Sequence, residues 1–137
     1  MTKYRSESWI DPRVERRKSA IEGFGTFANA PIRAGEVIFI FGGDLITDAE
    51  IAAGKVIDHS YVNIAEGLYL GHRVEAGVSV DDFLNHSCTP NIWMEDEVTL
   101  VTMRDIAAGE ELVIDYVMYL PSGWVAPWPC RCGTPAC

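Results

Sequence analysis

Short apolar runs alternate with turn residues along the chain, and this pattern predicts many short β-strands. Val37–Phe41 is a continuous β-branched and aromatic run that stops at Gly42, as is typical of a buried strand. Further runs of strand composition, each bounded by turn residues, are Val14–Ser19, Thr26–Ala28, Ser60–Ile64, Leu68–Leu70, Ile92–Met94, Val98–Met103 and Glu111–Tyr116. We therefore expect a mostly β fold with little helix.

One clear helix is predicted, over Asp48–Ala53. Thr47 and Glu50 have the spacing of a capping box, in which each residue satisfies a backbone N–H of the other. Gly54 can end the helix because glycine accepts the left-handed conformation that commonly follows a last helical turn. The helix is therefore short.

Two further turn patterns organise the chain. Gly23-Phe24-Gly25 interrupts the first pair of predicted strands. Ile32–Glu36 and Ile106–Glu110 resemble each other, and each is a turn that leads into an apolar strand. A single echo of this kind does not make a repeat architecture.

The length of 137 residues is that of one domain with one core. Hydrophobic residues make up 48% of the chain, which excludes a disordered protein. Composition changes near residues 119–121, beyond which Trp, Pro and Cys are frequent. We predict a main domain over residues 1–120 and a tail over residues 121–137.

The charge balance narrows the possible partners. Eleven basic residues stand against twenty acidic ones, and the net charge of −9 opposes binding to nucleic-acid phosphates. The same field attracts a basic protein or peptide. The N-terminal sequence has no apolar signal segment and the chain has no run of eighteen apolar residues, so we expect a soluble, cytoplasmic protein without membrane attachment.

The four cysteines form a pattern that is typical of a metal site. Cys130, Cys132 and Cys137 read C-x-C-x4-C within one short loop. Structural zinc is almost always bound by four ligands, so three tail thiolates require a fourth, and Cys88 is the remaining cysteine. Disulfide bridges and inert thiols are the alternatives, but a cytosolic setting and such close spacing favour metal binding.

A polar cluster, Asn-His-Ser-Cys-Thr-Pro-Asn, occupies Asn85–Asn91. A single histidine in such a turn is most simply a hydrogen-bonded core residue. The whole segment, however, resembles a signature of the SET-domain methyltransferase family, and Gly109–Tyr116 resembles that family's second signature. The four cysteines match its post-SET zinc motif, Gly23-Phe24-Gly25 its Gly-x-Gly cofactor loop, and Phe41–Asp44 a further loop. The resemblance runs from about residue 14 to the end.

This resemblance implies a SET-type fold of several small sheets with a pseudoknot, followed by a C-terminal zinc-binding post-SET tail. It also implies S-adenosylmethionine-dependent transfer of methyl groups to a lysine side chain of a protein substrate. A basic, lysine-containing substrate suits the acidic charge of the chain. Drawing the lysine into an apolar, aromatic-lined channel would lower its pKa and leave a neutral amine.

The resemblance also implies roles for individual residues. Tyr116 matches the family's active-site tyrosine. The implied cofactor-binding residues are Gly23, Phe24, Gly25, Asn85, His86 and Tyr116, and the implied zinc ligands are Cys88, Cys130, Cys132 and Cys137. Trp124 or Trp128 could cover the adenine ring or complete the lysine channel, or could fill the interior of the tail.

Three positions depart from the family pattern: Asp82 replaces a common Arg, Phe41 a common Tyr, and Met118 a common Phe or Tyr. They leave the number of methyl groups added open. They also support a rival interpretation, a catalytically reduced SET-like module with structural zinc that binds a peptide or the cofactor. A second rival is a thiol hydrolase that uses Cys88 and His86, although no third orienting group is evident.

Overall fold

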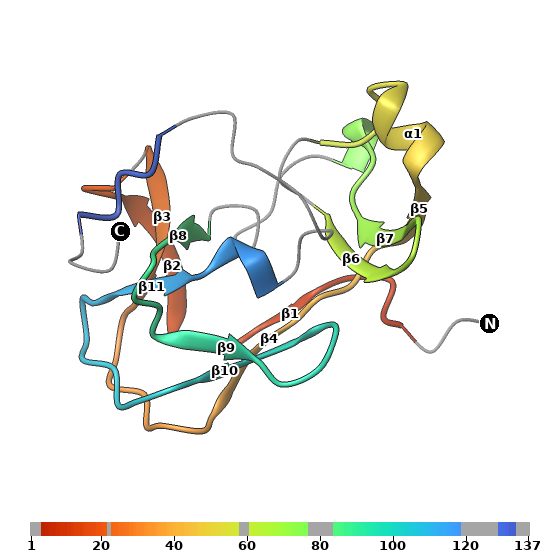
Figure 1. The fold of residues 1–137 in the computed structure, drawn as a ribbon. Helices are drawn as coiled ribbons and strands as arrows, with labels where there is room; N and C mark the ends of the chain where they lie inside the picture. Colours follow the sequence, from red (N-terminus) through yellow and green to blue (C-terminus); the bar gives the residue numbers. More distant parts are fainter. Residues whose placement is uncertain (1–3, 22, 58–60, 77–83, 119–128, 134–137) are drawn as a thin grey trace.

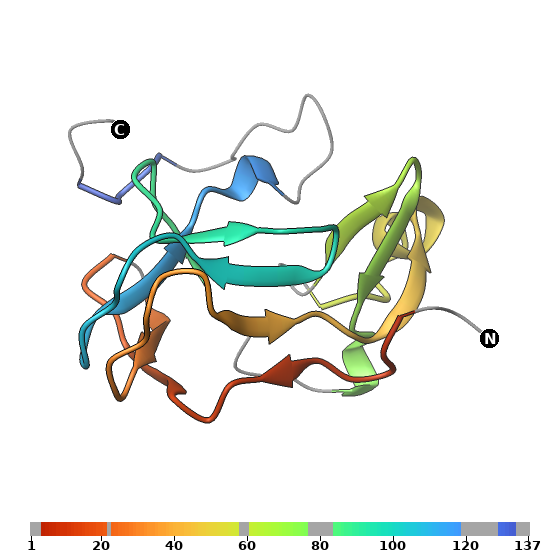
Figure 2. The same ribbon diagram turned by 90° about the horizontal axis from the view of Figure 1, so that it is seen from below.

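The computed structural model describes residues 4–21, 23–57, 61–76, 84–118 and 129–133 (Figure 1). These residues form three small sheets and one short α-helix. The first sheet has four antiparallel strands, which Figure 2 shows lying side by side. In spatial order they are β1 (Trp9–Ile10), β4 (Val37–Ile40), β10 (Thr99–Thr102) and β9 (Ile92–Met94).

The second sheet joins distant parts of the chain. Its order is β2 (Val14–Lys18), β3 (Phe24–Ala28), β11 (Glu111–Ile114) and β8 (Asn85–His86). The β2, β3 and β11 strands pair antiparallel, whereas β8 pairs parallel to β11. The second sheet therefore holds three of the sequence motifs: the Gly-x-Gly segment and both signatures.

The third sheet lies to the side of the other two (Figure 1) and has the order β5 (Asp44–Thr47), β7 (Leu68–Gly71) and β6 (Val62–Ala65). The helix α1 (Asp48–Ala52) follows β5 directly. Its predicted capping box is present: the Thr47 hydroxyl accepts the Glu50 N–H, and the Glu50 carboxylate accepts the Thr47 N–H at 3.1 Å.

The main core lies where the first two sheets pack together. Its fully buried side chains include Ile38 and Phe39 from β4, Leu100 from β10, and Leu112 and Ile114 from β11. Both faces of β11 are buried from Leu112 to Ile114, because the strand is covered on each side. This packing fixes β11 as the rigid element on which the site is built.

The two echoing turns also contribute to the core. Ile32 and Ile106 pair with each other in an antiparallel bridge, through reciprocal N–H to carbonyl bonds of 2.9 and 2.7 Å. Gly35 and Gly109 follow with φ of 82° and 86°, a backbone region that favours glycine. The sequence echo thus corresponds to two similar turns that meet in space.

The structure confirms the mostly β fold with one short helix and corrects several details. Phe24 and Gly25 lie in β3, because Gly25 pairs with β2, so the turn precedes them. The final long strand ends at Ile114, and Tyr116–Met118 forms a 3-10 turn. The strands β1, β5 and β8 were not predicted, since each is too short or too polar for its pattern to be distinguished from a loop.

No helix in the described part of the chain has the length and apolar character needed to cross a membrane. Of the predicted tail, the structure describes residues 129–133. The predicted boundary at residue 120 therefore falls outside the described residues and stays a prediction.

Candidate active site and metal cluster

The two signature segments lie side by side along β11. Asn85 is the register partner of Val113 and His86 that of Ile114, in a parallel pairing. The Ser87 N–H extends this contact by donating to the Ile114 carbonyl at 3.1 Å. The family resemblance implied that the two signatures lie side by side, and this pairing brings them together.

Asn91, the last residue of the first signature, anchors this arrangement. Its side chain is almost fully buried and forms hydrogen bonds to the β11 backbone, as a neighbouring strand would. Oδ1 accepts the Val113 N–H at 2.9 Å, and Nδ2 donates to the Glu111 carbonyl at 2.8 Å. A buried amide that satisfies both a donor and an acceptor of a strand holds that strand in one register. Sequence reasoning quoted Asn91 only as part of the motif and assigned it no function.

Glu111 connects the two signatures to the Gly-x-Gly segment. Its Oε1 accepts the Ser19 hydroxyl at 2.7 Å, and its Oε2 accepts Nδ2 of Asn85 at 2.8 Å. The Asn85 amide also donates to the Phe24 carbonyl at 3.1 Å. A Cβ on Gly25 would lie 2.1 Å from Glu111 Oε2, so only glycine permits this close approach. The sequence signal for Glu111 was a charged residue at the start of an otherwise apolar strand.

Tyr116 is held beneath the first signature. Its hydroxyl donates to the Leu84 carbonyl at 2.7 Å, and its ring lies 5.2 Å from the His86 ring, centroid to centroid. Burial, followed by the negative charge of Glu111, raises the pKa of Tyr116 to about 12. The phenol is therefore neutral at pH 7, and its hydroxyl donates a hydrogen bond.

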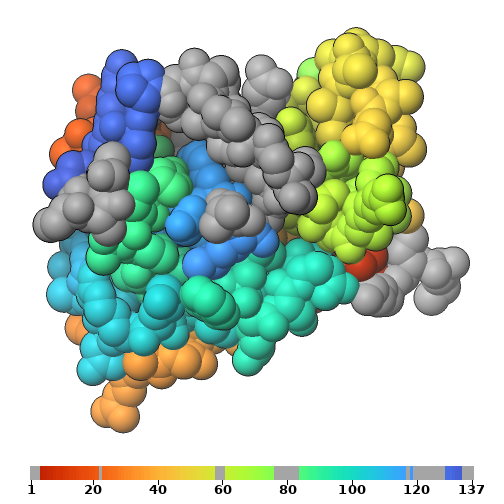
Figure 3. Space-filling model, viewed as in Figure 1, coloured from red at the N-terminus to blue at the C-terminus, as the bar shows by residue number. Residues whose placement is uncertain are grey.

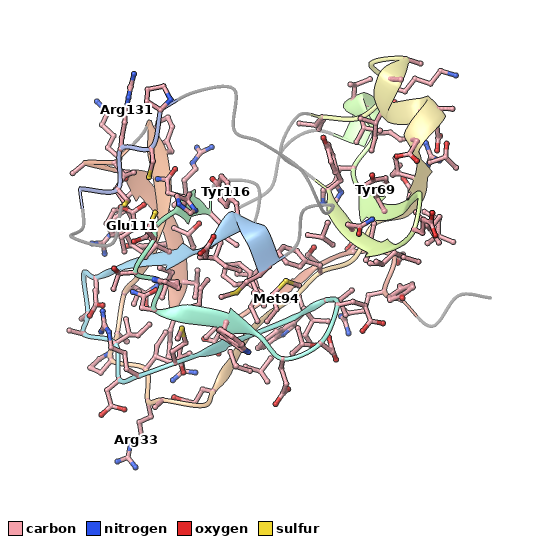
Figure 4. The ribbon with its side chains drawn as sticks, viewed as in Figure 1. Arg33, Tyr69, Met94, Glu111, Tyr116 and Arg131 are labelled. Carbon is pink, nitrogen blue, oxygen red and sulfur yellow. The ribbon has the colours of Figure 1, made fainter. Side chains whose placement is uncertain are left out.

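His86 contacts both the tyrosine and the cysteines. Its Nδ1 accepts the Tyr116 backbone N–H at 3.1 Å, and its Nε2 lies 3.2 Å from the Cys88 sulfur. Asp115 Oδ1 is farther from Nδ1, at 3.8 Å. The nearer backbone N–H can only donate, so it determines that Nδ1 is an acceptor. Figure 4 shows Tyr116 beside β8, in the same part of the molecule as Glu111.

The cysteines gather around Cys88. Its sulfur lies 3.9 Å from that of Cys130, and the donor atoms of His86, Cys88 and Cys130 all lie within 4.8 Å of one another. Two thiolates that share a tetrahedral zinc at about 2.3 Å are about 3.8 Å apart, so this spacing fits zinc. Figure 3 shows the segment of residues 129–133 packed against the surface next to β8.

Burial and the neighbouring thiols of Cys130 and Cys132 raise the pKa of Cys88 to about 12. Several thiolates can coexist here only if a cation balances them, which is the chemistry of a zinc site. None of the described cysteines forms a disulfide. The raised pKa of Cys88 also argues against the thiol-hydrolase rival. A reactive cysteine needs a lowered pKa, and the pKa of Cys88 is raised although the thiol contacts His86.

The remaining predicted residues have different positions. Phe24 is 44% exposed, and a Cβ on Gly23 would meet no atom within 4 Å, so both lie at the exposed start of β3. Phe41 is buried in the core and stacks on Phe39, and Met118 packs against the same core. The predicted ligand Cys137 and the candidates Asp82, Trp124 and Trp128 lie outside the described residues.

The chain belongs to the SET domain family, whose family model matches residues 23–117. It is 31% identical over 145 residues to "Histone-lysine N-methyltransferase ash1" of Drosophila melanogaster, which covers 93% of this chain. It is 32% identical over 136 residues to "Histone-lysine N-methyltransferase ATX2" of Arabidopsis thaliana, covering 88% of this chain. The chain spans only 6% and 12% of the length of these two relatives.

The fold is also similar to a solved structure. A chain of an apo ctPRC2 structure with two substitutions in Ezh2 superposes with a TM-score of 0.63 at 25% sequence identity. The match covers 80% of this chain and 15% of that chain. The similarity supports the predicted SET-type fold independently of the sequence motifs.

Proposed function

We propose that this SET domain is an S-adenosylmethionine-dependent protein-lysine methyltransferase. The observation that carries the proposal is the parallel pairing of β8 with β11, through which His86 of one signature contacts Tyr116 of the other. Several similar proteins are named as histone-lysine N-methyltransferases, and those from Drosophila and Arabidopsis are much longer than this chain. The proposal therefore concerns the domain that these relatives share with it.

The residues around Tyr116 fit a cationic methyl donor. The Phe24 carbonyl and the Glu111 carboxylate accept from the Asn85 amide, and the Leu84 carbonyl accepts from the Tyr116 hydroxyl, so several acceptor oxygens lie around Leu84 and Asn85. Such a group of oxygens favours a ligand that carries positive charge. When bound, S-adenosylmethionine supplies a methyl group on a sulfonium, which already holds the driving force for transfer.

Tyr116 orients the lysine amine. Its hydroxyl donates to the Leu84 carbonyl, and a hydroxyl oxygen can also accept an N–H of the amine. Its raised pKa keeps it neutral, so Tyr116 does not remove the lysine proton. That proton instead passes to water before transfer, because the apolar channel that the family resemblance implies would lower the pKa of the lysine. Tyr116 therefore contributes alignment of the amine toward the methyl group.

A basic, lysine-containing protein segment is the proposed substrate. The net charge of −9 favours such a partner. One similar protein, from Yarrowia lipolytica, is named as specific for lysine 4 of histone H3 and is 32% identical to this chain. We propose the histone H3 tail as the first substrate to test, and a reducing compartment such as the cytoplasm as the setting, since zinc binding needs free thiols.

Isotope transfer tests this function. The protein, loaded with zinc, is incubated with S-adenosylmethionine that carries a labelled methyl group and with an H3 tail peptide. We expect mass spectrometry to find the label on lysine, and to find none on a peptide in which arginine replaces every lysine. Calorimetry on the same sample measures cofactor binding separately.

The same experiment separates the rival function. Binding of the cofactor and peptide without transfer, over all peptides tried, would favour the catalytically reduced binding module. Absence of cofactor binding in zinc-loaded, folded protein would contradict the proposed methyltransferase, and peptide binding in that sample would favour a module that binds the peptide alone.

A further inference from the structure

His86 lies between the cysteine cluster and the proposed reaction centre. One ring nitrogen faces the sulfur of Cys88 at 3.2 Å, and the other faces the backbone N–H of Tyr116 at 3.1 Å. Its side chain is 23% exposed, and the contacts at its two nitrogens hold the ring in one orientation. A single imidazole therefore touches both sites through opposite atoms.

The protonation of the ring follows from these contacts. A backbone N–H donates only, so Nδ1 must carry the lone pair that accepts it. In a neutral imidazole the proton is then on Nε2, which points at Cys88. Nε2 thus donates to the sulfur and has no lone pair left for a metal ion. Although His86 lies within the group of possible ligands, this geometry places it outside the set that binds the ion.

The backbone N–H of Tyr116 is oriented by its hydrogen bond to His86. The paired part of β11 ends at Ile114 opposite His86, and Tyr116 begins the 3-10 turn that follows. Its N–H is held by His86 and its hydroxyl by the Leu84 carbonyl, so residues on either side of Asn85 fix both ends of the tyrosine. A rotation of the imidazole would release one of these two ends.

We propose that His86 is a positioning residue that couples zinc bound at Cys88 to the placement of Tyr116. The inference builds on the proposed function, which makes the tyrosine placement important. Zinc bound by Cys88 and Cys130 would fix the position of the Cys88 sulfur, and that sulfur lies 3.2 Å from Nε2 of His86. Zinc therefore holds the ring, and the ring holds the N–H of Tyr116.

Two matched variants test the contacts of the two imidazole nitrogens one at a time. In His86→Asn the amide oxygen replaces Nδ1 as the acceptor for Tyr116 but nothing replaces Nε2. In His86→Gln the longer amide reaches the position of Nε2, and the acceptor at Nδ1 is lost. We expect His86→Asn to weaken zinc binding about 10–100-fold. We expect His86→Gln to keep near wild-type zinc affinity and to speed hydrogen exchange of the Tyr116 amide about five- to tenfold.

Zinc removal completes the test. In the wild type, a chelator should speed exchange of the Tyr116 amide, and in His86→Asn that amide should no longer respond to zinc. Nitrogen-15 spectra of the zinc-loaded protein should show a protonated Nε2 and an unprotonated Nδ1. Three results would each overturn the inference. The first is a spectrum that shows zinc bound to Nε2, and the second is an equal effect of the two variants on zinc affinity and on Tyr116 amide exchange. The third is a wild-type Tyr116 amide whose exchange rate does not change when zinc is removed.

These observables do not involve methyl transfer. A protein that shows the predicted exchange and nitrogen signals but transfers no methyl group would contradict the proposed function and support the coupling. A protein that transfers methyl groups, but whose Tyr116 amide exchanges at the same rate with and without zinc, would support the proposed function and contradict the coupling.

Discussion

Gly25→Ala should destabilise the protein only while Glu111 is present. The new Cβ would lie 2.1 Å from Glu111 Oε2 and 3.0 Å from Asn85 Nδ2, whereas the backbone of Gly25 does not need a positive φ. The carboxylate must therefore move away and lose its bonds to Ser19 and Asn85. Since the carboxylate is only partly buried, we take about 1.5 kcal/mol for each of these two charged bonds, about 3 kcal/mol together.

This loss converts to a large shift in melting temperature. With about 2.1 cal/mol/K of unfolding entropy per residue, 137 residues give about 0.3 kcal/mol/K. A loss of about 3 kcal/mol then lowers the Tm by about 10 °C. Circular dichroism at fixed zinc and cofactor concentrations measures this shift, because either ligand changes the apparent stability.

The double variant decides whether the clash is the cause. Glu111→Ala removes the carboxylate and should itself cost about 3 kcal/mol, but Gly25→Ala added to it should then cost close to nothing. Gly23→Ala is the matched control: its Cβ meets no atom, its φ is +40°, and its strain of about 1 kcal/mol should be the same with or without Glu111. Additive losses for Gly25→Ala and Glu111→Ala would refute the reasoning.

Two further predictions concern the elements next to this site. Asn91→Ala leaves the Val113 N–H and the Glu111 carbonyl without their partner and should cost about 2–5 kcal/mol, seen as a Tm lower by about 7–17 °C; an unchanged Tm would contradict the role of Asn91 as an anchor. Native Tyr116 keeps its proton to about pH 12 while the unfolded chain loses it near pH 10, so its contribution is full below pH 10 and is lost from pH 10 to 12. The free energy of unfolding, measured with urea, should therefore fall more steeply from pH 10 to 12 in the wild type than in Tyr116→Phe. Equal dependence of this free energy on pH in the two proteins would argue against burial of the phenol.

The sequence predicted the parts of the fold that depend on local pattern. The apolar run Val37–Phe41 and the capping box at Thr47 have strong local signals, and both formed as expected. The two-residue strand β8 has no such signal, because its pairing with β11 depends on contacts between segments distant in sequence. Its position was implied only by the family resemblance, through the meeting of the two signatures.

The candidate site was predicted in its motifs but not in its connections. The resemblance implies separate roles for Tyr116, Asn85 and His86. In the structure Asn85 bonds Glu111, and Tyr116 bonds both His86 and the Leu84 carbonyl. A backbone carbonyl carries no signal in the sequence, and a partly buried glutamate looks like any solvated charge. These contacts could be identified only once the strands were placed.

Single-turnover methyl transfer by Tyr116→Phe, with cofactor binding measured on the same protein, tests the central claim most directly. Removing the hydroxyl should slow transfer to a lysine peptide by about 100-fold or more, because the amine loses its orienting partner. The Kd for S-adenosylmethionine should rise by a much smaller factor, because the Tyr116 hydroxyl is one of several acceptor oxygens in this region. Transfer at the wild-type rate by a folded, zinc-loaded Tyr116→Phe protein would show that the reaction centre does not lie where β8 and β11 meet.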